Sequence, residues 1–298
     1  KPLSLSVQQG RQLADAVKKY GVIARTDSEF RSVRKQNFAV ELVRNGYLGD
    51  LKRIEITFPS DPSPVAKQAD MPVPTGLNYD MWLGPAPFVP YTQMRVHDLN
   101  QTNKRPNWMR IDTYAQGMIS NWGAHYFDMA QWANNSENSG PVEVQGNGVF
   151  PKSLWNTMIN FKVWYKYANG VEMTCEQSPT STPSITYFGS KEWVKIDGYP
   201  GKATSSNPAL LDLKPKSGEM DLTGILWDKN DFIQGVRTQQ QTLVPIEVGH
   251  RAITISQIGL IACQIGEKLK WQPEKELFDG NNAANALLAA PHLRNKWL

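Results

Sequence analysis

The first fifty residues carry apolar positions at a helical spacing, interrupted by short extended runs. A capping-box pattern at residues 6–9 opens a predicted helix, which Gly21 ends. A short strand is expected at 22–24, a second helix from about 32 to 45, and an alternating strand at 51–58. This helix–strand–helix–strand order is typical of the second half of a doubly wound α/β domain.

A polar stripe crosses the otherwise apolar segment 117–133. If the segment is helical from about Trp122, then Asn121, His125 and Asp128 fall on one face. Such groups are costly to bury unless they are hydrogen-bonded or serve a function. A satisfied core histidine and a functional site are both compatible with this helix considered alone.

Beyond residue 140 the pattern changes to the two-residue alternation of strands. The alternating segments are residues 142–149, 156–167, 171–175, 185–188 and 192–196. Tight turns are expected at Asn169-Gly170 and Gly189-Ser190, so the segments predict an antiparallel sheet with one solvated face. An apolar helical stripe at 255–269 and a short tail helix at 282–290 follow.

Residues 59–107 form a Pro-rich excursion between these regions. Nine prolines lie in this stretch, so no long regular element is expected there. Trp82, Phe88 and Tyr91 make it too apolar for a simple solvated linker. A long irregular segment of this kind is usually functional or an interaction arm.

Composition and charge narrow the function classes. The 298 residues contain 32 Lys and Arg against 28 Asp and Glu, spread evenly, so no nucleic-acid or membrane partner is expected. Cys175 and Cys263 lie in apolar patterns and are expected as free, buried thiols. The four histidines lie far apart in the sequence, so no metal site is expected. The longest apolar stretch, 252–266, contains polar residues and predicts a buried helix.

Four short motifs follow one another along the chain. They are Lys1-Pro2-Leu3-Ser4-Leu5, Asn78-Tyr-Asp-Met-Trp82-Leu-Gly-Pro-Ala-Pro87, Asn121-Trp-Gly-Ala-His125-Tyr-Phe-Asp128, and Trp271-Gln-Pro-Glu-Lys-Glu with Asn281-Asn-Ala-Ala-Asn-Ala-Leu after it. Together they resemble the Gfo/Idh/MocA family, which includes glucose–fructose oxidoreductase and inositol dehydrogenase. The second and fourth motifs are similar to those of a bacterial branch of that family.

The resemblance implies a Rossmann domain followed by an α/β domain built on a large open sheet. We therefore expect an incomplete Rossmann-like domain followed by an α+β domain with a large, mostly antiparallel open sheet. The expected divisions are 1–50 as the C-terminal remainder of the Rossmann domain, 51–250 as the sheet-based substrate and oligomerisation domain with its excursion at 59–107, and 251–298 as C-terminal helices that pack back. A homodimer or homotetramer through the open sheet is implied.

The resemblance also implies a cofactor and a set of site residues. Members of the family oxidise or reduce a sugar or polyol hydroxyl with NAD or NADP, so a carbohydrate substrate is expected. Carried over, the catalytic positions are Lys1, Asn121 and His125, and the cofactor-binding positions are Lys1, Pro2 and Trp82. A histidine takes or relays a proton near neutral pH, and a lysine polarises the reacting oxygen or acts as the base if its pKa is lowered.

Two departures from the family pattern bear on function. Asn121 stands where the family usually has Asp; an amide orients a neighbour but does not act as a base. The glycine-rich nucleotide loop is absent from this sequence, so we expect the nucleotide-binding half to precede Lys1, with completion by a separate polypeptide as the alternative. The compartment stays open between bacterial periplasm and cytoplasm.

Substrate contacts are expected from the polar and aromatic stretch before the central helix. The candidates are Arg95, His97, Trp108, Arg110 and Tyr114, with Asp128 from the helix itself. Arginines beside aromatic rings suit a carbohydrate, and a loop that packs its own aromatics is the alternative for each residue. The leading function is an NAD(P)-dependent oxidoreductase acting on a sugar, glycoside or polyol. Two alternatives stay open: an NAD-recycling, glycoside-cleaving enzyme, and a non-catalytic sugar-binding or assembly protein.

Overall fold

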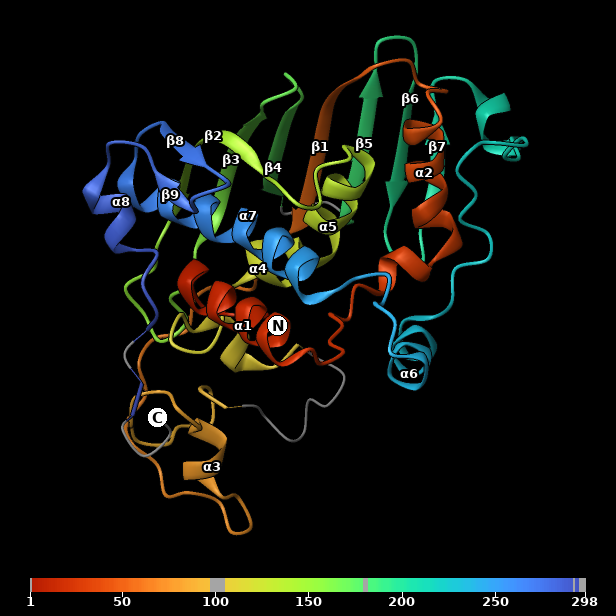
Figure 1. Ribbon diagram of the computed structural model, residues 1–298. Helices are drawn as coiled ribbons and strands as arrows, with labels where there is room; N and C mark the ends of the chain where they lie inside the picture. Colours follow the sequence, from red (N-terminus) through yellow and green to blue (C-terminus); the bar gives the residue numbers. More distant parts are fainter. Residues whose placement is uncertain (1, 97–104, 179–181, 292, 295–298) are drawn as a thin grey trace.

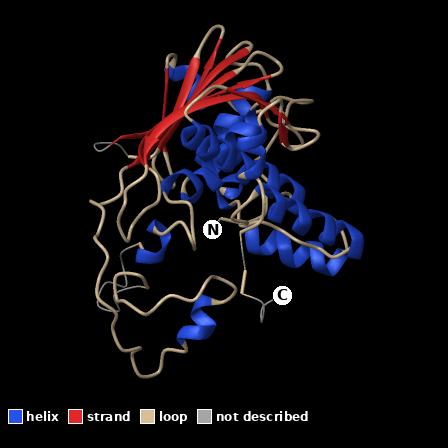
Figure 2. Ribbon diagram, turned by 90° about the vertical axis from the view of Figure 1, so that its left-hand side faces the viewer, coloured by secondary structure: helices blue, strands red, loops and turns tan. Residues whose placement is uncertain are grey.

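One large sheet forms a layer of the fold, and the helices gather on one of its sides (Figures 1 and 2). The computed structural model describes residues 2–96, 105–178, 182–291 and 293–294. Residues 60–96 form a long irregular segment, which we call the arm. It extends away from the sheet and carries a short helix, α3 (Tyr79–Leu83). No helix within the described ranges is long and apolar enough to cross a membrane.

The sheet has nine strands in the order β7-β6-β5-β1-β4-β3-β2-β8-β9. The strands are β1 (Leu51–Pro59), β2 (Pro141–Val149), β3 (Ile159–Tyr167), β4 (Glu172–Ser178), β5 (Ser184–Gly189), β6 (Trp193–Asp197), β7 (Lys202–Ser205), β8 (Leu269–Gln272) and β9 (Leu277–Phe278). Only the β1–β4 pair among them is parallel, with Ile54 opposite Met173. The expected mostly antiparallel open sheet is therefore confirmed.

The helices mostly begin and end where the sequence signals them. They are α1 (Val7–Tyr20), α2 (Arg34–Arg44), α4 (Met118–Asn121), α5 (Gly123–Ala133), α6 (Asp228–Thr238), α7 (Ile246–Ile265) and α8 (Asn282–Ala286), with 3-10 turns η1 (Glu29–Ser32), η3 (Asn107–Arg110) and η4 (Pro208–Asp212). Ser6 caps α1 by accepting from the Gln9 backbone N–H at 3.1 Å. The Gln9 side chain accepts from the backbone N–H of Leu5, one residue earlier than a standard capping box predicts.

Three local predictions were wrong. Residues 22–24 form no strand, because a strand needs a paired neighbour and none of the described strands pairs with them. The helical stripe expected to run to residue 269 ends at Ile265, because Gly266 adopts a left-handed backbone there and Leu269 belongs to strand β8. The tail helix α8 ends at Ala286, well before residue 290.

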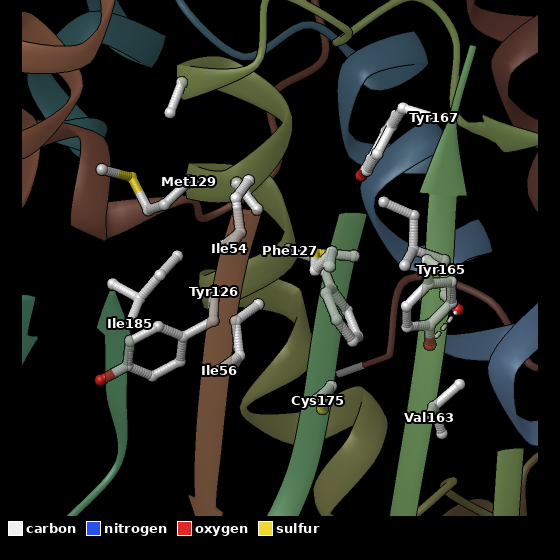
Figure 3. Close-up of a cluster of buried hydrophobic side chains, with 14 of the residues drawn as sticks. Ile54, Ile56, Tyr126, Phe127, Met129, Val163, Tyr165, Tyr167, Cys175 and Ile185 are labelled. Carbon is white, nitrogen blue, oxygen red and sulfur yellow. Dashed lines mark hydrogen bonds between the residues drawn. The ribbon is translucent and has the colours of Figure 1, made fainter. Parts of the chain in front are cut away.

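The core lies between the sheet and helices α5 and α7. Tyr126 and Phe127 of α5 point towards the strands, where Phe127 packs edge-on against Tyr165 (Figure 3). The Tyr165 hydroxyl donates to the backbone carbonyl of Ile255 at 3.0 Å. A Cβ at Gly259 would lie 2.1 Å from that hydroxyl, so only glycine lets α7 approach the strand this closely. Both cysteines are buried and free, as expected.

The arm is attached to the rest of the protein at both ends of its path. Val65 accepts from the backbone N–H of Leu154, and Met94 accepts from the Trp155 indole, so the β2–β3 connection holds one side. Arg294 donates to Asp80 at 2.7 Å and ties the C-terminal segment to the other side. The segment is therefore a packed arm rather than a solvated linker.

An ion network joins α1, α7 and the β8–β9 turn. Arg11 donates to Glu276 at 2.8 Å and to Glu247 at 2.7 Å, and the His250 ring nitrogen lies 2.7 Å from Glu276. Burial alone opposes ionisation of Glu276, but its hydrogen bonds to His250 and Arg11 lower its pKa from 4.5 to about 2.

We expect the Glu276 network to make stability fall in acid. A depressed folded-state pKa stabilises the protein above the ordinary pKa, and this stabilisation is lost as pH falls from about 4.5 towards 2. Glu276→Gln should therefore be less stable than wild type at neutral pH, and the difference should shrink across that window. Urea unfolding at a series of pH values measures it. The exposed Glu274→Gln, in the same turn, is the control, and a pH-independent difference for Glu276→Gln would contradict the expectation.

Candidate active site

The polar stripe of the central helix begins at a turn that only glycine readily adopts. Gly117 precedes α4 with a φ of +68°, and a Cβ there would lie 2.8 Å from the Thr157 side chain. This turn sets the direction of α4, which places Asn121 at its end, half-buried. His125 follows in the first turn of α5 and is 5% exposed.

His125 lies in a cluster of aromatic rings with one carboxylate, which we call the His125 cluster: Glu29, Phe30, Trp122, His125 and Tyr199. The imidazole stacks on Phe30 with ring centroids 4.5 Å apart, and Tyr199 stacks against Phe30 at 5.3 Å. The Nε2 atom of His125 lies 3.8 Å from Oε1 of Glu29. Burial, and then the charge of Glu29, raise the pKa of Tyr199. The cluster therefore joins a carboxylate, an imidazole and a phenol.

Asp128 lies behind this cluster, in a different environment from the expected one. Both of its carboxylate oxygens accept from Arg31, at 2.7 and 2.9 Å, and both side chains are 1% exposed. A bidentate pair of this kind leaves little acceptor capacity for a ligand. Asp128 therefore anchors α5 to η1, and its expected role as a substrate contact stays a prediction.

A cavity of about 800 Å³ lies beside the N-terminal segment. Its walls come from residues 5–9, the arm, the stretch before α4, the β2–β3 connection and α7. Of the predicted site residues, the cavity wall includes Trp82, Trp108 and Tyr114. We call this the amide-lined cavity, because Gln116 and Gln257 are among its lining residues.

The remaining candidates lie outside that cavity's described lining. Arg110 donates to Asp61 at 3.0 Å and lies over the Trp155 ring at 4.8 Å, so its guanidinium is engaged by the protein, and its expected substrate contact stays a prediction. Arg95 lies near Tyr114, where its charge partly offsets the effect of burial, which raises the pKa of Tyr114. Pro2 is half-buried. Lys1 and His97 lie outside the described residues.

Residues 63–298 match the model of the oxidoreductase family, C-terminal alpha/beta domain, of the Gfo/Idh/MocA group. The chain belongs to the Gfo/Idh/MocA oxidoreductase family. The family that the four motifs resembled is thereby confirmed. The division into domains at residues 50 and 250 stays a prediction, as do the roles of the individual site residues.

Solved structures share the fold at low sequence identity. An aldose–aldose oxidoreductase from Caulobacter crescentus, complexed with glycerol, is 15% identical with a TM-score of 0.60, over 91% of this chain and 70% of that one. The WlbA dehydrogenase from Bordetella pertussis, in complex with NADH and UDP-GlcNAcA, is 11% identical with a TM-score of 0.61, over 91% and 70%. GenD2 from gentamicin A biosynthesis, in complex with NAD, is 14% identical with a TM-score of 0.60, over the same shares. No curated protein sequence matches the chain.

For a dinucleotide cofactor, the described residues offer a proton-exchanging group in the His125 cluster but no cationic side chain in the wall of the amide-lined cavity. The His125 cluster offers hydrogen-bonding groups suited to a hydroxyl that gains or loses a proton. No lysine, arginine or histidine is among the described residues that line the amide-lined cavity, so that cavity does not suit a pyrophosphate. Nor do three His, Cys, Asp or Glu side chains of the described chain come together as metal ligands.

Sequence reasoning missed four residues of this region. Glu29 reaches His125, and Tyr199 reaches Phe30, from segments far away in the sequence. Gln116 and Gln257 both donate to backbone carbonyls of the N-terminal segment. None of the four stands in a motif or a periodic stripe that marks it. The one local signal was that Gln116 directly precedes the Gly117 turn, and this position alone does not mark a functional residue.

Proposed function

We propose that this protein is an oxidoreductase that uses NAD or NADP to transfer a hydride to or from a sugar, glycoside or polyol hydroxyl. Family membership supports an oxidoreductase. The observation that carries the rest is the His125 cluster, where an imidazole faces a carboxylate among aromatic rings. That neighbours of the same fold were solved with NAD or NADH supports the cofactor, and the glycerol and UDP-GlcNAcA complexes support a carbohydrate.

In this proposal the chain's own residues handle the proton. His125 takes the proton from the substrate hydroxyl, and Glu29 orients the imidazole and stabilises its protonated form. Asn121 hydrogen-bonds a neighbouring hydroxyl, because an amide is both donor and acceptor. Lys1 polarises the reacting oxygen, and Pro2 and Trp82 contact the cofactor. Nicotinamide, when bound, supplies or accepts the hydride.

Glu29 provides a test of this arrangement as a positioning residue. Glu29→Gln should lower kcat about tenfold with KM little changed, because the carboxylate acts on the proton held by His125 rather than on substrate binding. Glu29→Asp should restore part of the rate. Steady-state kinetics measure the split. An increase in KM at unchanged kcat would instead make Glu29 a binding residue.

Asn121 leaves open a second candidate function, an NAD-recycling, glycoside-cleaving enzyme. Its amide can orient a substrate hydroxyl in either reaction but cannot act as a base. Incubation of the purified protein with NAD or NADP and a panel of sugars, glycosides and polyols separates the two. Accumulation of reduced cofactor with a keto-sugar supports the dehydrogenase. Aglycone release without net reduced cofactor supports cleavage, and sugar binding without either product supports a binding or assembly protein.

We further propose a homodimer or homotetramer through the open face of the sheet. That face carries cross-strand ion pairs such as Lys162–Glu176, at 2.9 Å, and is not covered by the helical layer (Figure 2). A charged sheet face pairs with a second copy through complementary charges, so the association should weaken with salt. Sedimentation at low and high ionic strength measures it, and a monomer at both would contradict this assembly.

A further inference from the structure

Arg105 lies half-buried just before η3 and brings a positive charge that the described chain does not neutralise by an ion pair. Asp61 is the acid whose charge acts on it, but Oδ1 of Asp61 accepts from Arg110 at 3.0 Å. The Oδ2 atom of Asp61 is buried and has no hydrogen-bond partner, so Arg105 does not bond to it either. Two guanidinium groups therefore share one carboxylate, and one positive charge is left over.

The hydrogen-bond donors of Arg105 are only partly used. Its Nη1 contacts the sulfur of Met118, which is a weak acceptor. Its Nε and Nη2 atoms have no partner among the described residues, and neither of them is a fully buried atom. Arg31 binds both oxygens of Asp128 with the same two nitrogens. Arg105 therefore presents an open fork of the kind that holds a carboxylate elsewhere in this protein.

The Trp122 ring connects this fork to the His125 cluster. The centroid of the ring lies 5.7 Å from the guanidinium carbon of Arg105 and 6.3 Å from the centroid of the imidazole. Met118, which Arg105 contacts, stands three residues before Asn121 on α4, so the two lie on neighbouring parts of the helix surface. The open fork is thus one aromatic ring away from the proposed proton-transfer group.

The surroundings of Arg105 oppose its charge. Burial lowers the pKa of Arg105, Asp61 opposes this shift, and Arg110 adds to it. An arginine stays charged at neutral pH all the same, so the cost of its desolvation is borne by the fold. A desolvated charge of this kind without a bonded counter-charge is typical of functional sites, where a ligand supplies the missing partner.

We propose that Arg105 binds an anionic group, a carboxylate or a phosphate, on the molecule that enters the site beside His125. Its two parallel N–H groups match two oxygens of either group, whereas a hydroxyl offers one oxygen and no charge. Together with the proposed hydride transfer, on which this part rests, the assignment makes the substrate an alcohol that carries a carboxylate or a phosphate.

Calorimetric titration of the purified protein tests the preference with matched ligands. Glycerol is measured beside glycerate and glycerol 3-phosphate, and glucose beside glucuronate and glucose 6-phosphate. In at least one set an anionic member should bind saturably and about tenfold or more tighter than its neutral counterpart, the ratio expected for hydrogen bonds to a charged group. The tighter anion tells a carboxylate from a phosphate. No anion bound, or neutral members bound as tightly in both sets, would overturn the proposal.

Variants identify Arg105 as the place of binding. Arg105→Leu should weaken the anionic ligand about tenfold to a hundredfold and leave its neutral counterpart unchanged. Arg105→Lys should fall in between, because it keeps the charge without the fork. The exposed Arg237→Leu on α6 removes the same charge elsewhere and should bind as wild type does. If circular dichroism shows that Arg105→Leu does not fold, Arg105→Gln takes its place.

Two results with the folded variants would overturn the assignment. One is wild-type affinity for the anionic ligand. The other is a loss of NAD or NADP affinity with the anionic alcohol unaffected, because the anion bound by Arg105 would then belong to the cofactor. Titration of each variant with NAD and NADP provides this comparison.

The anion site and the hydride transfer fail separately. His125→Ala should keep the affinity for the anion while losing turnover, because Arg105 and not His125 provides the charged contact. Anion binding that depends on Arg105, in a protein without any turnover, would end the proposed hydride transfer and leave the anion site standing. Turnover of neutral alcohols that Arg105→Leu leaves unchanged, with no preference for anionic ones, would end the anion site alone.

Discussion

Arg31→Met destabilises the folded protein by about 3–5 kcal/mol, the cost of removing one partner from a buried ion pair. The Arg31 guanidinium donates twice to Asp128 and once to Glu137, at 3.0 Å, and it lies over the Trp132 ring at 4.5 Å. Its loss leaves the Asp128 carboxylate buried without a counter-charge. Urea unfolding monitored by circular dichroism gives the free-energy difference.

A double variant separates the ion pair from the packing around it. Arg31→Met combined with Asp128→Leu should recover part of the lost stability, because no charge is then left buried. Lys52→Ala, in the exposed Lys52–Asp50 pair, should stay within about 0.5 kcal/mol of wild type. A loss below about 1 kcal/mol for Arg31→Met would show that Asp128 finds solvent or another partner, contrary to its burial.

His125→Ala lowers turnover about 10²- to 10⁴-fold, the usual contribution of a general acid or base. The imidazole is the one group of the His125 cluster suited to exchange a proton near neutral pH, and its stacking on Phe30 holds it in place. Rates with the substrate identified from the sugar panel measure the effect as kcat and KM.

The effect of His125→Ala on folding has to be measured beside its effect on turnover. His125→Gln keeps a side chain of similar length without acid–base chemistry, so it should lose turnover as His125→Ala does while retaining more of the packing. Lys52→Ala should keep full turnover. If His125→Gln and His125→Ala keep more than about a tenth of the wild-type kcat, His125 is not the proton-transfer group.

The fold could be predicted from the sequence where local chemistry determines an element. Ser6 and Gly21 mark the two ends of α1 because capping oxygens and left-handed backbone are properties of single residues. The alternation from 159 to 167 predicts β3 because one face of the sheet is buried and the other is not. Residues 22–24 were mispredicted as a strand for the complementary reason: a strand also requires a partner, which local chemistry does not supply.

The site was predicted only in part. The stripe of Asn121, His125 and Asp128 is visible in the sequence, but the same stripe gives no sign that Asp128 belongs to Arg31. Aromatic candidates before α4, such as Trp108, do line a cavity, whereas Arg110 is engaged by Asp61. The residue types suggested acid–base and sugar-binding chemistry. The hydrogen-bond partners of each side chain in the fold decided which of them remain available to a ligand.

The sequence by itself determined the secondary-structure pattern, the resemblance to an oxidoreductase family and the helix that carries His125. The tertiary structure alone decided that Glu29 faces His125 and that Gln116 and Gln257 both donate to backbone carbonyls of the N-terminal segment. The physical reason is the sequence separation of the residues that interact. Capping, turns and amphipathic faces follow from neighbours a few residues apart, whereas these contacts depend on how the sheet brings together segments separated by about a hundred residues or more, as when β1 pairs with β4.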